Sequence, residues 1–79
     1  MATLRLFAQA REAAGVGALD IAGTTVGDVI DSATDRFGAQ FETIVAGSKI
    51  WVNGQPAERV DGVGDGDEVA ILPPVSGGA

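Results

Sequence analysis

One helix decides the fold of this chain, and its sequence runs from Thr24 to Gly38 as TTVGDVIDSATDRFG. Thr25 is a natural N-cap, and Asp28 three residues later resembles a capping box with Asp in place of Glu. Apolar side chains recur at spacings of three or four, at Val26, Val29, Ile30, Ala33 and Phe37. Gly38 supplies the C-terminal stop. We expect an amphipathic helix that packs its apolar stripe on a sheet, with its aspartates in solvent.

Two strands are predicted before this helix. Residues 3–9 alternate, with Leu4, Leu6 and Ala8 on a buried face and Phe7 as the one large aromatic on the opposite face. Phe7 is either covered by a neighbouring loop or part of an apolar partner-binding patch. Residues 10–14 could form a helical turn, and residues 18–22 form a second strand whose Leu19 and Ile21 point inward.

The second half predicts a short turn or helix and then more strands. Residues 40–45 have helical spacing but are too short to predict a helix firmly. Lys49 to Val52 is a strand, and Asn53-Gly54 is the strongest tight-turn signal in the chain. A short edge segment over 55–57 and a last strand over 69–72 follow. We expect Trp51 to pack in or around the core.

This order of elements predicts an α+β fold, the β-grasp or ubiquitin-like architecture, with a mixed sheet of four to five strands and one main helix on one face. The first and last strands should be parallel and central, because the helical crossover joins the two halves. Residues 1–72 form the domain, and residues 73–79 form a flexible extension after a central strand.

That extension reads Pro73-Pro74-Val75-Ser76-Gly77-Gly78-Ala79. Its prolines lack backbone donors and favour extended backbone, and its glycines add freedom, so it cannot continue the sheet. Fully extended, it reaches roughly 23 Å. The segment is either a frayed chain end or an uncharged arm suited to a partner's narrow channel.

Composition excludes several classes of function. The chain has no cysteine and no histidine, so disulfides, thiolate metal sites and cysteine nucleophiles are excluded, and no metal or cofactor is expected. A net charge of −6 argues against nucleic acid as a partner. No apolar run is long enough to span a membrane, and residues 1–11 do not resemble a secretory signal, so we expect a cytoplasmic protein.

Residues 61–68, DGVGDGDE, imitate two ligand-binding motifs. The glycines imitate a phosphate-binding loop, but no helix follows them, and the acids lack the ligand order of a calcium loop. A turn rich in Gly and Asp is the better interpretation, because those residues tolerate left-handed backbone.

Four segments together resemble the small, sulfur-carrying subunit of molybdopterin synthase, the MoaD type of the ThiS/MoaD ubiquitin-like family. These segments are LFAQARE at 6–12, VNG at 52–54, DGDEVA at 65–70 and PPVSGG at 73–78. The thiamine-pathway carrier shares the fold and the Gly-Gly end, but it does not usually have the first segment or the two prolines.

The resemblance implies a chemistry and three partners. In the family, an ATP-dependent activating enzyme adenylates the terminal glycine, a sulfur donor converts the adenylate to a thiocarboxylate, and the large synthase subunit uses that sulfur on a pyranopterin precursor. The chain would then be a non-catalytic sulfur-donor subunit rather than an enzyme. Gly77 and Gly78 match the family's diglycine, with Gly78 as the sulfur bearer. The implied partner-binding residues are Phe7, Arg11, Leu72, Pro73, Pro74 and Val75.

One residue departs from the family pattern, because Ala79 follows Gly78 and holds its carbonyl in a peptide bond. There are three interpretations of Ala79. A peptidase removes it, it reflects a boundary of the sequence, or the protein works with an alanine end, which is sterically poorer. Two alternatives to the molybdenum pathway stay open at this point. The chain could carry sulfur for cysteine or thiamine, or act as a ubiquitin-like modifier or interaction module.

Overall fold

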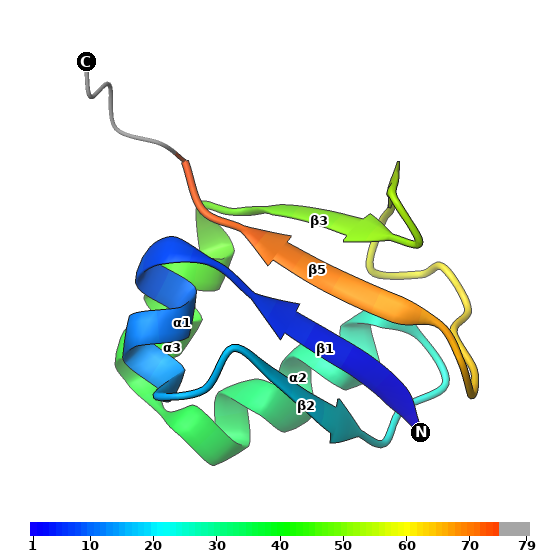
Figure 1. Cartoon of the computed structure of the whole chain (residues 1–79), viewed down its shortest axis with the longest axis horizontal. Helices are drawn as coiled ribbons and strands as arrows, with labels where there is room; N and C mark the ends of the chain where they lie inside the picture. The colour runs from blue at the N-terminus through cyan, green and yellow to red at the C-terminus, as the bar shows by residue number, and fades with distance from the viewer. Residues whose placement is uncertain (75–79) are drawn as a thin grey trace.

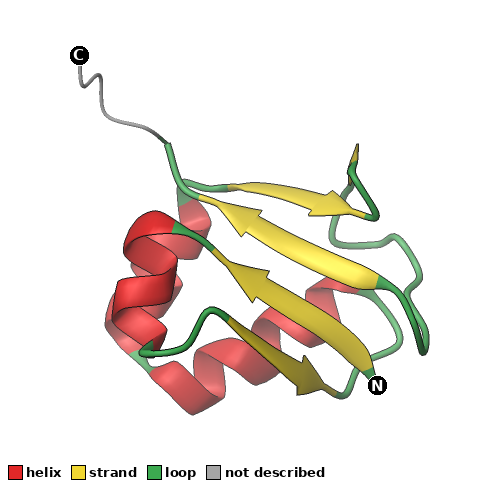
Figure 2. Cartoon of the chain, viewed as in Figure 1, coloured by secondary structure: helices red, strands yellow, loops and turns green. Residues whose placement is uncertain are grey.

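A computed structural model describes residues 1–74, which form a five-stranded sheet with helices on one face (Figures 1 and 2). In chain order the elements are β1 (Ala2–Leu6), α1 (Ala8–Ala14), β2 (Ala18–Ile21), α2 (Val26–Phe37), α3 (Ala39–Ala46), β3 (Lys49–Val52), β4 (Gln55–Pro56) and β5 (Glu68–Leu72). None of the helices within residues 1–74 has both the length and the apolar composition needed to cross a membrane.

The strand order confirms the predicted mixed sheet. It is β2-β1-β5-β3-β4, with β1 and β5 parallel at the centre and every other pair antiparallel. In the parallel pair Thr3 lies opposite Glu68 and Leu6 lies opposite Ile71. Because β1 and β5 run the same way, the chain leaves β5 at the end of the sheet opposite the N-terminus (Figure 1).

The predicted capping of α2 is also confirmed, except that the Asp28 carboxylate bonds to Thr24 instead of to the N-cap residue Thr25. The Asp28 N–H donates to Thr25 Oγ1 at 3.1 Å, as an N-cap requires. The Asp28 carboxylate accepts from the Thr24 hydroxyl at 2.8 Å and from the Thr24 N–H at 3.1 Å. These bonds hold the pKa of the Asp28 carboxyl below its usual range. The helix ends at Gly38, whose φ of 95° lies in the left-handed region.

The prediction for the end of β1 is wrong. The strand stops at Leu6 instead of Gln9, and Ala8 is exposed rather than inward-facing. Residues 8–14 form a full helix, because alanine, glutamine, arginine and glutamate are strong helix formers. The Phe7 carbonyl accepts hydrogen bonds from the N–H groups of Ala10 at 3.1 Å and Arg11 at 3.3 Å.

The segment after α2 is more regular than its sequence predicted. Helix α3 has eight residues and buries Phe41 completely. The rings of Phe37 and Phe41 lie 5.2 Å apart at an angle of 55°, so the ends of α2 and α3 share one aromatic contact. The core joins buried residues from β1, β2, β5 and all three helices, namely Ala2, Leu4, Leu6, Ala10, Ile21, Val29, Ala33, Phe41, Val69 and Ile71.

Trp51 is not a core residue, which corrects the expectation for it. In the β3–β5 pairing Ile50 lies opposite Ile71, and these two face the helices together with Val69. Successive side chains of a strand point to opposite faces, so Trp51 and its partner Ala70 lie on the open face of the sheet.

The Asn53-Gly54 turn forms as predicted. Both residues have positive φ, 50° and 82°, as a two-residue type I′ hairpin requires, and Val52 pairs with Gln55 across it. The Asn53 side chain also reaches β5. Its Oδ1 accepts from the Glu68 N–H at 2.9 Å, and its Nδ2 donates to Asp67 Oδ1 at 3.0 Å.

Candidate functional site

The site predicted at the end of β5 has a rigid base. Ile71 is fully buried, Leu72 is half-buried and pairs with Lys49 of β3, and Pro73 is buried as well. Pro74 is exposed and is the last residue described. Figure 2 shows the chain leaving the sheet beside the start of β3. The neighbouring strands β1 and β3 therefore fix the position of the end of β5, from which Pro73 and Pro74 follow.

The structure brings Phe7 close to this base. Leu6 pairs with Ile71, so Phe7 and Leu72 lie one residue further along two neighbouring strands, at the same end of the sheet. Phe7 has extended backbone and is 41% exposed, which makes it one of few exposed large apolar side chains within residues 1–74. Phe7 and Leu72 thus supply apolar surface beside the exit of the chain.

Arg11 lies on α1 next to the loop that leads to β2. A Cβ atom placed at Gly17 would come within 3.3 Å of Arg11 Nε, so the glycine leaves room for the arginine side chain. Arg11 and Lys49 make no side-chain hydrogen bond or ion pair with any other residue of 1–74. Both cations are available to a partner.

Some predicted site residues lie outside the described part of the chain. These are Val75, Gly77, Gly78 and the blocking residue Ala79. Conversely, the sequence did not identify Lys49 and Trp51 as neighbours of the site. Both lie on the open face of the sheet. Their alternation with Ile50 and Val52 was visible in the sequence, but only the register against β5 shows which pair faces the helices.

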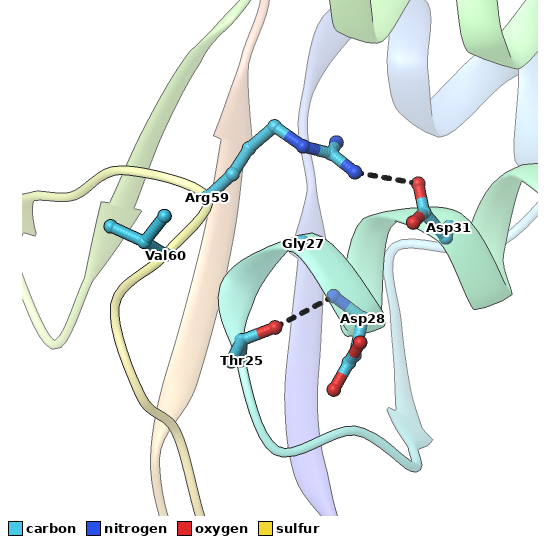
Figure 3. A pocket seen from close by; sticks show the side chains of 6 residues that line it. All are labelled: Thr25, Gly27, Asp28, Asp31, Arg59 and Val60. Carbon is cyan, nitrogen blue, oxygen red and sulfur yellow. Dashed lines mark hydrogen bonds and ion pairs between the residues drawn. The ribbon is translucent and has the colours of Figure 1, made fainter.

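A hollow of about 430 Å³ lies at the start of α2 (Figure 3). Its first-turn donors are already used, since the Val26 N–H donates to the Asp61 carbonyl at 2.9 Å and the Gly27 N–H to the Arg59 carbonyl at 2.8 Å. Arg59 Nη2 donates to Asp31 Oδ1 at 2.8 Å. With donors and cation engaged inside the chain, this hollow is not suited to an anion.

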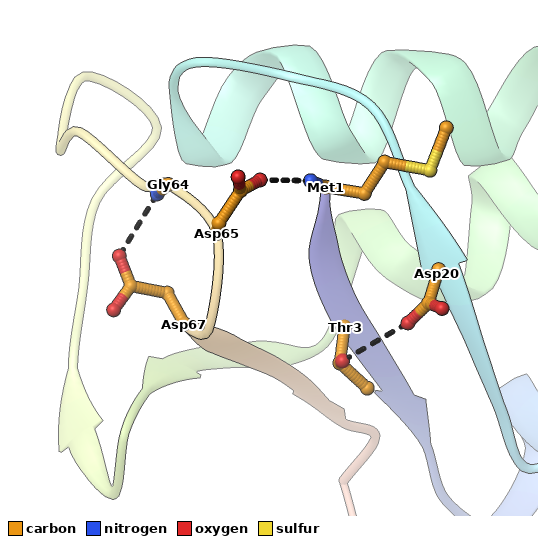
Figure 4. Close-up of polar contacts among 6 residues, drawn as sticks. All are labelled: Met1, Thr3, Asp20, Gly64, Asp65 and Asp67. Atoms are coloured by element: carbon orange, nitrogen blue, oxygen red, sulfur yellow. Dashed lines mark hydrogen bonds and ion pairs between the residues drawn. The ribbon is translucent and has the colours of Figure 1, made fainter.

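The loop before β5 forms a turn, as predicted, and its acidic side chains bond to the chain itself (Figure 4). The Asp67 carboxylate accepts from Asn53 Nδ2 and, at 2.9 Å, from the Gly64 N–H, and these bonds hold its pKa below the usual range. Asp65 accepts from the Met1 ammonium group, which lowers the pKa of its carboxyl. Within residues 1–74, no three His, Cys, Asp or Glu side chains group as metal ligands.

Comparison with known proteins agrees with the fold. The family model described as the ThiS family matches residues 4–78. Small archaeal modifier protein 1 from Methanosarcina acetivorans is 35% identical, with a TM-score of 0.83 over 98% of this chain and 95% of that one.

Two further solved structures are similar to this chain. A putative molybdopterin converting factor subunit 1 from Pyrococcus furiosus is 30% identical, with a TM-score of 0.82 over 94% of this chain and 97% of that one. A chain of the BexX/CysO complex from Amycolatopsis orientalis is 25% identical, with a TM-score of 0.83 over 99% of this chain and 100% of that one. This chain therefore belongs to the ThiS family, whose ThiS/MoaD-type members are small ubiquitin-like sulfur carriers.

Proposed function

We propose that the chain carries sulfur for molybdenum cofactor biosynthesis as the small subunit of a molybdopterin synthase. The observation that carries the proposal is the rigid exit of Pro73-Pro74 from a central strand, directly before the segment that contains Gly77 and Gly78. The MoaD-like motifs favour this pathway, and a putative molybdopterin converting factor subunit 1 is among the similar structures, at 30% identity.

The proposed chemistry takes place at the carboxylate of Gly78, after Ala79 has been removed. That carboxylate attacks the α-phosphorus of ATP, pyrophosphate leaves, and a mixed anhydride forms. A sulfide equivalent from the sulfur donor then attacks the acyl carbon. AMP departs as the leaving group, and Gly78 is left as a thiocarboxylate. Glycine suits this reaction because it has no Cβ to obstruct the nucleophile. The large subunit then transfers the sulfur to the pyranopterin precursor, and water restores the carboxylate.

The body of the chain would position this end rather than catalyse the reaction. We assign residues 1–72 to the docking domain and residues 73–79 to the reactive arm. Phe7, Arg11 and Leu72 would contact the activating enzyme and the large subunit, with Pro73, Pro74 and Val75 at the mouth of their channels. Because adenylation uses ATP, we expect this chemistry in the cytoplasm.

Intact mass measurement tests the proposal. The full chain and a chain ending at Gly78 are incubated with the activating enzyme, ATP and a sulfur donor. We expect the mass to increase only for the shorter chain, by the difference between one sulfur and one oxygen atom. The thiocarboxylated chain should then yield a dithiolene product with the large subunit and the precursor. A shorter chain that never gains sulfur contradicts the proposal.

Protein modification is a second candidate, favoured by the 35% identity to a small archaeal modifier protein. In that case the same activated Gly78 would be attacked by a lysine amine of another protein. Cell extracts decide between the two functions, because a modifier would be found covalently joined to lysines of other proteins. Detection of only free chain and non-covalent complexes would count against modification.

A further inference from the structure

The two edges of the sheet differ in what they offer to another strand. Strand β4 forms one edge, and Pro56 is its outward-facing residue, because the next residue, Ala57, turns its N–H inward to the Ile50 carbonyl at 3.0 Å. Proline has no N–H and cannot donate to an added strand. This edge is therefore blocked, which is one way in which natural sheets avoid unwanted pairing.

The other edge is β2, the outermost strand beside β1 in Figure 1. The Leu6 N–H donates to the Gly17 carbonyl at 2.9 Å. Bonded and non-bonded pairs alternate in an antiparallel ladder, so the backbone N–H and C=O groups of Ala18 and Asp20 point away from β1. Both residues are exposed, and these backbone groups bond to no other residue of 1–74. Free donors and acceptors at alternate residues are what an extended chain needs to pair with a sheet edge.

A hollow lies beside this edge, between β2 and α2. It has a volume of about 250 Å³ and is lined by Met1, Asp20, Ile21, Ala22, Ser32 and Arg36. Arg36 is exposed, and its side chain makes no hydrogen bond or ion pair with any other residue of 1–74. The Asp20 carboxylate instead accepts from the Thr3 hydroxyl at 3.2 Å (Figure 4). The hollow therefore presents an unpaired positive charge next to the free backbone groups of β2.

We propose that β2 binds an extended segment of another protein as an added strand, and that a carboxylate side chain of this segment pairs with Arg36. Side chains directly opposite each other in a sheet lie on the same face, so the residues of the segment opposite Leu19 and Ile21 face α2. An aspartate or glutamate at one of these positions lies beside the hollow. The inference is independent of the proposed function, which uses the exit of the chain from β5.

A second copy of the chain suits this edge less well. If two β2 strands paired with each other, their Leu19 and Ile21 side chains would face the helices, and neither residue can neutralise Arg36. Each copy also has a net charge of −6, so two copies repel each other. The occupant is therefore a strand of a different protein, with an acidic residue at a helix-facing position.

Amide hydrogen exchange of the isotope-labelled chain, followed by NMR, provides the test. The probes are two capped eight-residue peptides of alternating threonine and valine, in which one central valine is replaced by glutamate or, in the control peptide, by glutamine. With the glutamate peptide in excess of its dissociation constant, exchange of the Ala18 and Asp20 amides should slow roughly tenfold or more, because a bonded amide exchanges only when its bond opens. The glutamine peptide should bind roughly two- to fivefold more weakly, as for the loss of one exposed ion pair.

Two substitutions at Asp20 distinguish strand addition from binding elsewhere. Asp20→Pro removes an outward N–H and no bond to β1, because Thr3 and Asp20 form a non-bonded pair. Asp20→Ala is the matched control, since it loses the same carboxylate and keeps the N–H. Asp20→Pro should bind the glutamate peptide roughly fivefold more weakly than Asp20→Ala. Slow exchange of the Leu19 and Ile21 amides shows that each variant retains β2.

Arg36→Gln tests the charge in the hollow without changing the strand. This variant should bind the glutamate and glutamine peptides equally, because the difference between the peptides depends on the guanidinium. It should fold as wild type, since Arg36 is exposed.

Each step can be overturned. The inference fails if neither peptide slows exchange of the Ala18 and Asp20 amides, if Asp20→Pro binds as tightly as Asp20→Ala, or if Arg36→Gln still prefers the glutamate peptide. It also fails if these amides exchange slowly in the concentrated free chain and faster on dilution, which would show that a second copy occupies the edge. None of these measurements uses ATP or a sulfur donor, so their outcome is distinct from that of the proposed function.

Discussion

The two ends of the sheet carry polar side chains that are used in different ways. The acidic end comprises Asp20, Asp28, Asp31, Glu58, Asp61, Asp65, Asp67 and Glu68. The exit end comprises Phe7, Arg11, Lys49, Leu72 and Pro74. At the acidic end Asp67 and Asp28 accept hydrogen bonds from the chain itself. At the exit end the side chains of Arg11 and Lys49 make no hydrogen bond or ion pair with any other residue of 1–74. Internal bonding marks the first end as structural, and its absence leaves the second free for partners.

The backbone shows the same contrast. Within residues 1–74, two non-glycine residues have positive φ, Asn53 at 50° on the acidic end and Ala8 at 49° on the exit end. Asparagine tolerates this region, whereas for alanine it costs about 1–2 kcal/mol. The turn at Asn53 is thus relaxed and the turn at Ala8 is strained. Strain beside Phe7 is consistent with an exit end shaped for binding rather than for stability.

Phe7→Ala should give the largest effect and the sharpest test of this contrast. Affinity for the activating enzyme should fall by about 2 kcal/mol or more, roughly thirtyfold, because a large apolar side chain at the exit end is lost. The free energy of unfolding should fall by only about 1 kcal/mol, since Phe7 is partly exposed. Calorimetric titration and denaturant unfolding measure the two quantities. Equal affinity in the variant would remove Phe7 from the docking surface.

Asn53→Ala should produce the opposite pattern. It leaves the Glu68 N–H and one Asp67 oxygen without their partner and puts alanine at positive φ. The unfolding free energy should fall by about 2 kcal/mol, with enzyme affinity unchanged. Gln55→Ala on the same hairpin is the control and should change stability little, because Gln55 is exposed. Weaker enzyme binding by folded Asn53→Ala would show that the acidic end is not purely structural.

Ala8→Gly tests the strain at the exit end. Glycine adopts positive φ without the Cβ penalty but loses more backbone entropy on folding, so the net gain in unfolding free energy should be about 0.5–1 kcal/mol. Ala8→Val should lose stability, because a β-branched residue is a poor fit at positive φ. Thermal unfolding measures both variants. If Ala8→Gly unfolds at a lower temperature than wild type, Ala8 is not strained.

The sequence predicted helix α2 and the turn after β3 because their signals are local, and it predicted the parallel centre of the sheet from the order of the elements. The Thr25 cap, the apolar stripe that follows it and the Asn53-Gly54 turn each depend on residues close in the chain. The errors concern tertiary context. Ala8 continues the alternation of Leu4 and Leu6, so only its reversed backbone shows that β1 has ended.

The candidate site could be predicted in part. Phe7 and Leu72 meet because β1 and β5 are parallel neighbours, which the order of elements already indicated. The hollow lined by Thr43, Ile44 and the two prolines could not be predicted, because it depends on where α3 packs against Pro73 and Pro74. The face of the sheet on which Trp51 lies could not be predicted either. It depends on the register of β3 against β5, which a short strand does not encode by itself.

Acid sensitivity should belong to the acidic end, and it is the smallest effect expected. Hydrogen bonds lower the pKa values of Asp28, Asp65 and Asp67 from an ordinary value of 3.8. Because each folded pKa lies below the unfolded one, the stabilisation is complete above about pH 4 and is lost as the pH falls through the lowered values. Asp67→Asn should therefore make the fall of unfolding free energy below about pH 4 shallower, while Phe7→Ala should leave that slope unchanged. Denaturant unfolding across this pH range measures it. An unchanged slope in Asp67→Asn would mean that its bonds to Asn53 and Gly64 do not persist in solution, and the acidic end would lose its distinction from the exit end.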